Sequence, residues 1–100
     1  MNSLVKNNLS LVQKILKHYN VQSAYLFGSA TSLQFNDNSD IDILFSFKDD
    51  LDYETYSNNY FAIITELEKL LNRQVDLIAE KTLSNKYLIE KINSQKIQIV

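Results

Sequence analysis

The chain lacks cysteine and proline altogether, and it contains only one glycine, Gly28, and one arginine, Arg73. Without cysteine it cannot form disulfides, zinc–thiolate sites or a thiol nucleophile. Without proline, no proline-marked linker divides it. The single glycine is informative, because it is where the backbone can most easily adopt unusual dihedral angles or approach a ligand closely.

Excess positive charge and long apolar runs are also missing. The net charge is −2 and there is no broad basic surface, so we expect no direct nucleic-acid partner. No stretch approaches the roughly 18 apolar residues of a membrane span, and the amino terminus has no apolar targeting segment. We therefore expect no membrane association and a cytoplasmic location. Apolar residues make up 45% of the chain, which predicts a single domain over residues 1–100.

Hydrophobic periodicity predicts alternating helices and strands. The expected helices cover residues 4–19, 29–34, 56–71 and 83–93, and the expected strands cover 21–27, 40–47, 74–78 and 97–100. This order predicts an α/β (α+β) fold, in which a small mixed sheet of three to four strands has its helices packed mainly on one face.

Two of these helices are expected to bury a set of apolar side chains. In the helix over 56–71 the set is Tyr60, Phe61, Ile64, Leu67, Leu70 and Leu71, whereas Glu66, Glu68 and Lys69 fall outside it. In the helix over 83–93 the set is Leu83, Tyr87, Leu88 and Ile92.

Residues suited to phosphate and metal chemistry accompany three of the predicted strands. Gly28 and Ser29 follow the first strand directly. Asp40 and Asp42 are two residues apart on the second strand, so both side chains lie on the same face. Asp76 lies in the middle of the short apolar strand that follows the second long helix. A carboxylate in that setting requires an explanation.

Three carboxylates brought together repel one another, by roughly 4 kcal/mol per pair at 4 Å for an effective dielectric of about 20. Such a cluster is unfavourable unless it is protonated or neutralised by a cation. Oxygen ligands without histidine or cysteine suit Mg²⁺ or Mn²⁺, and two such ions roughly 3.5–4 Å apart serve phosphoryl transfer. Gly28 lets the backbone approach a triphosphate, to which the Ser29 hydroxyl can donate.

Each feature also has a purely structural explanation. The paired aspartates could be a strand-start cap and a surface residue, and Asp76 could form an ion pair with Arg73 or a lysine. A calcium-binding EF-hand loop starting at Asn38 is excluded, because its sixth position requires glycine and holds Ile43. The order and setting of the features together favour a functional site over these separate explanations.

At these residues the sequence resembles the nucleotidyltransferase superfamily that includes DNA polymerase beta. It resembles more closely the minimal nucleotidyltransferase (MNT) proteins of bacteria and archaea. The matching motifs are Phe27-Gly28-Ser29, Ser39-Asp40-Ile41-Asp42-Ile43-Leu44 and Val75-Asp76-Leu77-Ile78. The resemblance implies that Gly28 and Ser29 bind the nucleotide phosphates, and that Asp40, Asp42 and Asp76 are catalytic residues that bind two Mg²⁺ ions. Asp76 would also help to deprotonate the attacking group.

One segment departs from the family pattern. Relatives often carry Ala-Arg-Gly shortly after Gly-Ser, whereas Thr31-Ser32-Leu33 occupies that place here. The loop therefore lacks a cation that could balance the triphosphate charge, although Lys48 or Arg73 could substitute for it. Catalytic activity could accordingly be reduced, altered or lost.

MNT proteins are commonly paired with a small helical HEPN protein in a toxin–antitoxin module, in which the MNT protein is the antitoxin. The resemblance implies transfer of a nucleoside monophosphate, AMP from ATP, to a hydroxyl of a HEPN-like toxin within a hetero-oligomer. Two alternatives stay open: an antitoxin with weak or no activity that neutralises the toxin by binding, and a nucleotidyltransferase that modifies a small antibiotic. A chain this small has little room for its own acceptor pocket, which favours a protein acceptor.

Overall fold

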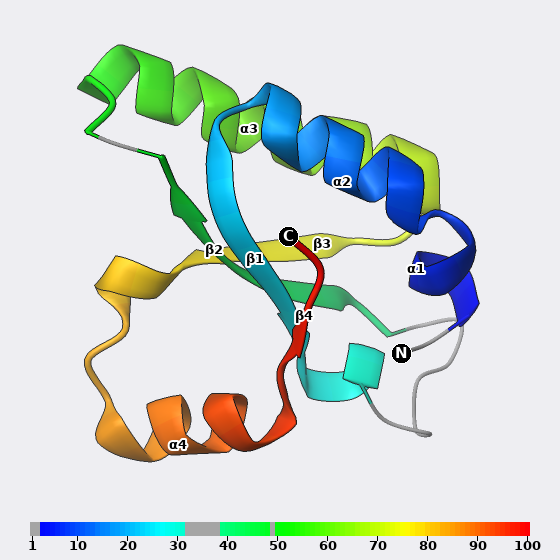
Figure 1. The fold of residues 1–100 in the computed structure, drawn as a ribbon, viewed down its shortest axis with the longest axis vertical. Coiled ribbons are helices and arrows are strands. Elements are labelled where there is room, and N and C mark those ends of the chain that lie inside the picture. Colours follow the sequence, from blue (N-terminus) through cyan, green and yellow to red (C-terminus); the bar gives the residue numbers. More distant parts are fainter. Residues whose placement is uncertain (1–2, 32–38, 49) are drawn as a thin grey trace.

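A computed structural model describes residues 3–31, 39–48 and 50–100 of the chain. Helices and strands follow one another along it (Figure 1). In the text, η denotes a short 3-10 helix. The elements are α1 (Ser3–Asn7), α2 (Leu9–His18), β1 (Val21–Phe27), η1 (Gly28–Thr31), β2 (Ile41–Phe47), α3 (Tyr53–Leu71), β3 (Val75–Ala79), η2 (Glu80–Thr82), α4 (Lys86–Gln95) and β4 (Ile97–Gln98). Within the described part of the chain, no helix is both long enough and apolar enough to cross a lipid bilayer.

The strands form one four-stranded mixed sheet in the order β3-β2-β1-β4. β1 runs antiparallel to both β2 and β4, whereas β2 and β3 run parallel. The parallel pair is joined through α3, as a parallel connection requires. The sheet confirms the predicted fold class, including the short terminal strand.

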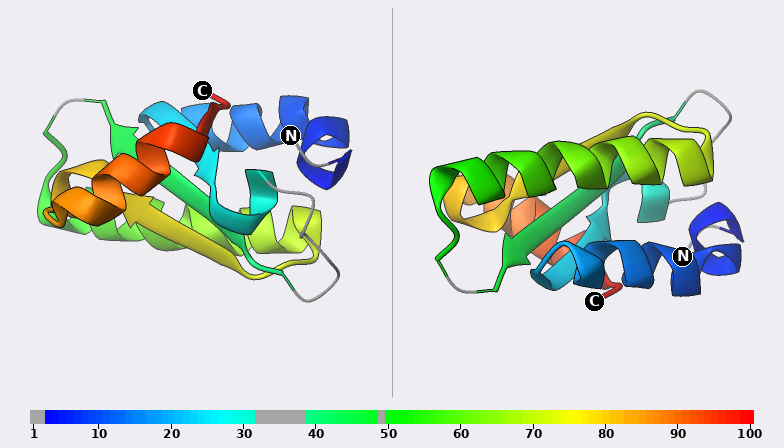
Figure 2. Two further views of the ribbon diagram at one scale, coloured as in Figure 1. Left: turned by 90° about the horizontal axis from the view of Figure 1, so that it is seen from below. Right: turned by 90° about the horizontal axis from the view of Figure 1, so that it is seen from above.

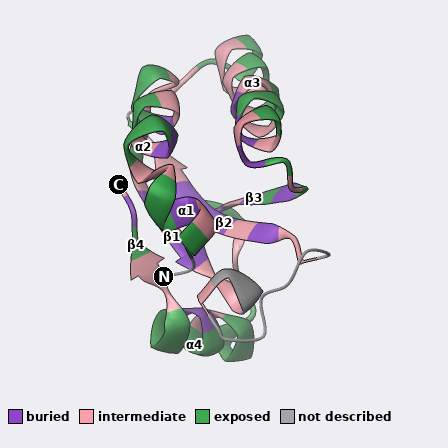
Figure 3. Ribbon diagram, turned by 90° about the vertical axis from the view of Figure 1, so that its right-hand side faces the viewer, coloured by how far each residue is buried: buried purple, intermediate pink, exposed green. Residues whose placement is uncertain are grey.

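Helices α2 and α3 lie side by side over one face of the sheet (Figures 1 and 2). Their apolar side chains pack against those of the strands to form the main core, which includes Leu16, Ile43, Phe45, Ile63 and Leu67. Helix α4 and η1 lie on the opposite side (Figure 3). The two long helices therefore share one face, as expected, and the other face is left to the shorter elements.

Two buried side chains mark where α4 covers this second face. Leu44 lies between Ile43 and Phe45 on β2, so its side chain points away from the main core. It is only 2% exposed, and Ile92 of α4 is 3% exposed. Neither belongs to the main core cluster. We infer that they form a second apolar contact beneath α4.

The N-terminal helix expected over residues 4–19 is divided at Asn8 into α1 and α2. The Asn8 side-chain amide donates to the Leu4 carbonyl at 2.9 Å, and its backbone N–H donates to the Val5 carbonyl at 3.1 Å. Asparagine side chains compete with helical hydrogen bonds in this way, so periodicity alone does not reveal the break.

Helix α3 begins at Tyr53, three residues before the predicted start at residue 56. The Asp52 carboxylate accepts a hydrogen bond from the Thr55 backbone N–H at 2.7 Å and so caps the first turn. The helix ends at Asn72, whose φ of 52° is left-handed, as the sequence predicts. One predicted core residue is wrong, because Phe61 is 63% exposed.

The last helix begins later than expected, at Lys86, because the Asn85 side chain caps it by accepting from the Leu88 N–H at 3.2 Å. Tyr87 is 81% exposed and Leu88 is 41% exposed, so their predicted burial is wrong, whereas Ile92 is buried as expected. The first part of the short helix predicted over 29–34 corresponds to η1. The rest of that predicted helix and most of the loop predicted after it, residues 32–38, lie outside the described residues.

Candidate active site

Asp42 and Asp76 occupy matching positions on the two parallel strands. Asp42 is in register with Asp76, and their neighbours Ile41 and Ile43 are in register with Val75 and Leu77. Residues in register on adjacent strands place their side chains on the same face. Because the isoleucines are buried in the main core, both carboxylates lie on the opposite face, the side that holds η1 and α4.

The electrostatics of the Asp42 carboxyl reflect this proximity. Its side chain is half-buried, and burial is the main cause that raises its pKa from 3.8 to about 6. A hydrogen bond with the Asp76 carboxyl and the negative charges of Asp76 and Asp40 raise the pKa further. The three predicted carboxylates therefore interact in the folded chain, and Asp40, directly before β2, acts on Asp42 through its charge.

Gly28 packs directly against the same carboxyl group. Strand β1 pairs with β2 so that Phe27 lies opposite Asp42, and Gly28 turns the chain into η1 with a φ of +66°. A Cβ atom at this position would lie 2.5 Å from Asp42 Oδ2. The backbone therefore needs glycine for both its dihedral angle and its closeness to the carboxylate.

The turn that follows Gly28 is closed by its own side chain. The Thr31 hydroxyl donates to the Gly28 carbonyl at 2.8 Å. Thr31 thus has a structural role in the segment that departs from the expected family pattern. Ser32 and Leu33, which complete the departure from the family pattern, lie outside the described residues, as does the side chain of Ser29. The structure therefore brings Gly28, Asp40, Asp42 and Asp76 together.

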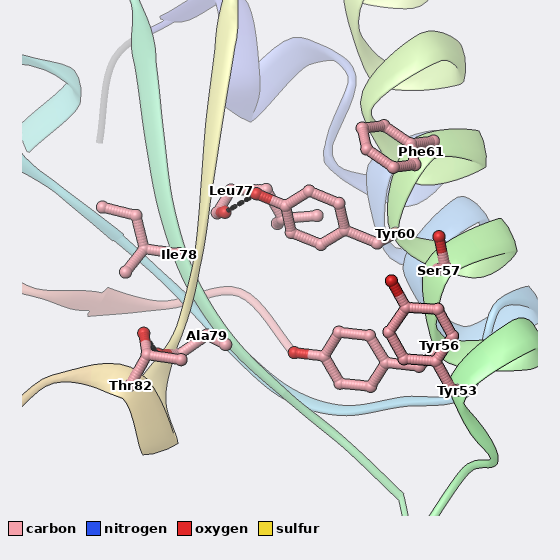
Figure 4. Close-up of a pocket in the computed structure, with 9 residues that line it drawn as sticks. All are labelled: Tyr53, Tyr56, Ser57, Tyr60, Phe61, Leu77, Ile78, Ala79 and Thr82. Carbon is pink, nitrogen blue, oxygen red and sulfur yellow. Dashed lines mark hydrogen bonds between the residues drawn. The ribbon is translucent and has the colours of Figure 1, made fainter.

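Two side chains of α3 hold the backbone on either side of Asp76. The Glu68 carboxylate accepts from the Val75 N–H at 2.9 Å, and the Tyr60 hydroxyl donates to the Leu77 carbonyl at 2.6 Å (Figure 4). Asp76 itself is exposed. Both bonds were missed by the sequence analysis, which placed Tyr60 in the core and Glu68 outside the apolar stripe. No local pattern signals them, because each joins residues that meet only when α3 packs on β3.

The carboxylates suit a divalent cation, although they do not form a preassembled cage. Across residues 3–31, 39–48 and 50–100, no three acidic or histidine side chains are gathered closely enough to constitute a ready metal centre. The ligand set nevertheless consists of oxygen alone, which Mg²⁺ prefers. Burial and, to a smaller extent, the neighbouring carboxylates raise the pKa of Asp42, and a bound cation would favour its ionised form. The residues present therefore fit such an ion.

The chain is similar in sequence to known proteins. Residues 11–100 match the family described as "Polymerase beta, Nucleotidyltransferase". A protein of Methanocaldococcus jannaschii with the provisional name protein adenylyltransferase is 39% identical over 98 residues, covering 97% of this chain and 96% of the relative. A second protein of that organism, with the same provisional name, is 34% identical over 97% of this chain and 96% of its own length.

The fold is also similar to chains of solved toxin–antitoxin complexes. One complex contains AMP-PNP; the similar chain is 28% identical with a TM-score of 0.72, over 93% of this chain and 73% of that one. Another contains a tri-AMPylated Shewanella oneidensis HEPN toxin with its MNT antitoxin, at 26% identity and a TM-score of 0.65, over 95% and 71% of the two chains. With the extent of the family match and of the archaeal relatives, these findings establish that the chain belongs to the polymerase beta nucleotidyltransferase family.

Proposed function

We propose that this chain transfers AMP from ATP to a hydroxyl of a partner protein, and that the transfer depends on Mg²⁺. The observation that carries the proposal is the pairing of Asp42 with Asp76 in register, with the Gly28 backbone packed against the Asp42 carboxyl. Family membership supports nucleotidyl transfer as the reaction class. The two archaeal relatives carry a protein adenylyltransferase name, which supports a protein as the acceptor.

Asp40, Asp42 and Asp76 are the proposed ligands of two Mg²⁺ ions, as in two-metal phosphoryl-transfer enzymes. When bound, these ions would neutralise the phosphate charge and polarise the reacting oxygens. The chain's own contribution is to hold three carboxylates on one face, against repulsion that already raises the pKa of Asp42. Gly28 and Ser29 are the proposed contacts to the nucleotide phosphates.

Asp76 is the proposed general base. It is exposed at the edge of the sheet, so an acceptor hydroxyl from another protein can reach it. The acceptor oxygen attacks the α-phosphorus of ATP while its proton passes to the Asp76 carboxylate. The bond between the α-phosphorus and the bridging oxygen of the β-phosphate breaks, and pyrophosphate leaves. The product carries AMP on the acceptor oxygen.

The proposed acceptor is a HEPN-like toxin, and this chain is the proposed antitoxin of the pair. A similar solved structure holds a tri-AMPylated HEPN toxin in complex with its MNT antitoxin, which supports both the partner and the hetero-oligomer. A second similar structure contains an ATP analogue, which supports ATP as the donor. The pair would act in the cytoplasm, where ATP and Mg²⁺ are supplied.

A second candidate function is neutralisation of the toxin by binding alone. It is favoured by the replacement of the expected basic turn with Thr31-Ser32-Leu33, since Thr31 closes the turn and supplies no positive charge to the triphosphate. Asp42→Asn separates the two functions. A folded Asp42→Asn variant that still neutralises the toxin at wild-type potency supports binding alone, whereas lost neutralisation supports catalysis.

The direct test incubates the purified chain with Mg²⁺, α-labelled ATP and the HEPN protein encoded beside it. We expect label on the HEPN protein with the wild type and with Glu90→Gln, a control that changes an exposed carboxylate of α4. Asp42→Asn and Asp76→Asn should transfer no label while remaining folded by circular dichroism. Equal labelling by Asp76→Asn and the wild type would rule out the proposed base.

A further inference from the structure

A groove of about 470 Å³ lies between the first half of α3 and the strand β3 with η2. Aromatic side chains of α3, among them Tyr53, Tyr60 and Phe61, form one wall (Figure 4). Leu77 and Ile78 of β3 lie on the other side. The groove is thus built mainly from aromatic side chains of α3 and apolar side chains of β3. Strand β3 also carries the proposed base.

The groove leaves large aromatic surfaces in contact with water. Tyr53 is 89% exposed and Phe61 is 63% exposed. Neither position is needed to close the main core, to which Ile63 and Leu67 of the same helix contribute. Aromatic side chains are enriched where proteins bind one another, because they bury a large area at low entropic cost. The two exposed rings are therefore suited to contact a partner.

Backbone pairing with a partner strand is disfavoured on this side, although β3 is an edge strand. The Val75 N–H already donates to Glu68, and the Leu77 carbonyl already accepts from Tyr60. At the end of the strand, the Ala79 carbonyl accepts from the Thr82 hydroxyl at 2.7 Å. A partner would consequently bind through side chains placed in the groove rather than as an added strand.

Acidic residues flank the residues that line the groove along the sequence, although none of them belongs to the lining itself. Asp52 and Glu54 lie on either side of Tyr53, Asp76 precedes Leu77 and Glu80 follows Ala79, and all four are exposed. The Lys81 ammonium lies 4.9 Å from the centre of the Tyr56 ring, so its charge is held against an aromatic side chain. A complementary partner surface is basic.

We propose that this groove binds the acceptor protein, through a basic segment that inserts an aromatic or aliphatic side chain between Tyr53 and Phe61. The proposal rests on the proposed function, because it gives the acceptor a docking site on β3, the edge strand that carries Asp76. Leu77 and Ile78 follow Asp76 directly along β3. A segment held in the groove would therefore keep its parent protein at the edge of the sheet from which Asp76 is exposed.

The first test measures binding without catalysis. The probes are three short labelled peptides: a lysine-rich peptide with a central leucine and tyrosine, the same peptide with both replaced by serine, and an acidic version with the apolar residues retained. Fluorescence anisotropy with the full chain should show that the first peptide alone binds, and that added salt weakens it. Phe61→Ser should weaken binding by about tenfold or more, as expected for a central interface residue.

The matched control is Leu11→Ser, which replaces an apolar residue of α2 that is 51% exposed and lies outside the groove. This control should bind the basic peptide as the wild type does. Equal binding by Phe61→Ser and the wild type, or equal binding of the acidic peptide, would overturn the proposal. So would a concentration-dependent dimer that Phe61→Ser abolishes, because a second copy of the chain would then occupy the groove.

The second test uses the neighbouring HEPN protein as acceptor. Phe61→Ser should raise the KM for that protein about tenfold, with kcat and ATP binding unchanged. A lowered kcat with an unchanged acceptor KM contradicts docking at the groove while leaving the proposed transfer intact. Absence of transfer by every variant, with the peptide result preserved, contradicts the proposed function and leaves the groove as a site for a basic partner.

Discussion

The carboxyl groups of Asp42 and Asp76 face each other across a parallel strand pair and interact directly, although both carry negative charge when ionised. Like charges directly opposite each other on adjacent strands destabilise a sheet. The pair lies on the face of the sheet that holds η1 and α4, where Asp42 is half-buried and Asp76 is exposed. Its unfavourable electrostatics makes folding stability dependent on both pH and divalent cations.

The first prediction concerns that pH dependence. The pKa of Asp42 is raised to about 6 in the folded chain from 3.8, so the folded state binds more protons between these values. The Asp42 contribution to stability is therefore fully present below about pH 4 and is lost as the pH rises through about 6. Burial is the main cause of this raised pKa, and the Asp76 hydrogen bond and the charges of Asp76 and Asp40 add to it. Urea unfolding without divalent cations should show stability falling between about pH 4 and 7.

Asp42→Asn should remove this decline, and Mg²⁺ should raise the unfolding midpoint of the wild type near pH 7 but not that of the variant. The measurement should stop near pH 4. Below that value the lowered pKa of Asp52, caused by its hydrogen bonds from Thr55, gives stability that is lost as the pH falls. Parallel pH curves for the wild type and Asp42→Asn would show that the carboxyl pair does not govern the effect.

The second prediction concerns Gly28. Gly28→Ala must place a side chain at a φ of +66°, at a cost of roughly 1–2 kcal/mol in stability. The added Cβ would also meet Asp42 Oδ2 at 2.5 Å. Because a carboxylate can rotate away, most of that clash will displace Asp42 rather than unfold the chain. We expect modest destabilisation in urea but loss of Mg²⁺ binding and transfer.

The matched control for Gly28→Ala is Asn20→Ala. Asn20 has a φ of 70°, and asparagine tolerates this left-handed conformation better than alanine, so alanine there adds backbone strain after α2. The control should lose less stability than Gly28→Ala, because asparagine already carries a Cβ atom, and should keep Mg²⁺ binding. If both variants bind Mg²⁺ equally well, the contact between Gly28 and Asp42 has no functional importance.

The sequence predicted those parts of the fold that depend on local periodicity. Alternation on β2 correctly placed Asp42 opposite the buried Ile41 and Ile43. The contacts of Asp42 with Asp76 and Gly28 depend instead on strand register and on the path of the chain into η1. Neither is encoded in spacing along the sequence. The family resemblance, rather than periodicity, supplied the expectation that these residues meet.

The errors also have local physical causes. Asn8 divides a helix because its side chain binds the Leu4 carbonyl, and side-chain competition of this kind leaves the apolar pattern unchanged. Tyr87 was expected inside because it shares the helical period with Leu83. In the folded chain, however, Ile92 is buried whereas Tyr87 stays exposed. A periodic stripe predicts burial only where another element supplies a matching surface.

The third prediction compares two residues of α4. Ile92→Ala should cost about 2–5 kcal/mol in stability, because Ile92 is 3% exposed and truncation leaves a cavity. Tyr87→Ala should change stability by no more than about 0.5 kcal/mol, because that side chain is 81% exposed. Urea unfolding measures both. Similar losses from the two variants would mean that α4 is bound through a different face.

The last prediction concerns the two hydrogen bonds that flank Asp76. Tyr60→Phe removes the hydroxyl that donates to the Leu77 carbonyl at 2.6 Å, and it keeps the ring that packs 6.0 Å from Phe45. The lost bond should cost about 1 kcal/mol in stability. Because the bond fixes the strand next to Asp76, we expect kcat for AMP transfer to fall while the KM for ATP stays nearly constant.

Glu68 allows a sharper comparison at the other flank. Glu68→Gln retains an oxygen that can accept from the Val75 N–H, whereas Glu68→Ala leaves that donor without its partner. The glutamine variant should therefore keep wild-type transfer, and the alanine variant should lose it along with Mg²⁺ affinity measured by calorimetry. Thr65→Val serves as the control on the same helix, because its exposed hydroxyl bonds only to the Phe61 carbonyl. If Glu68→Ala and Thr65→Val lower stability equally and both keep normal transfer and Mg²⁺ affinity, the bond to Val75 supports the fold without positioning Asp76.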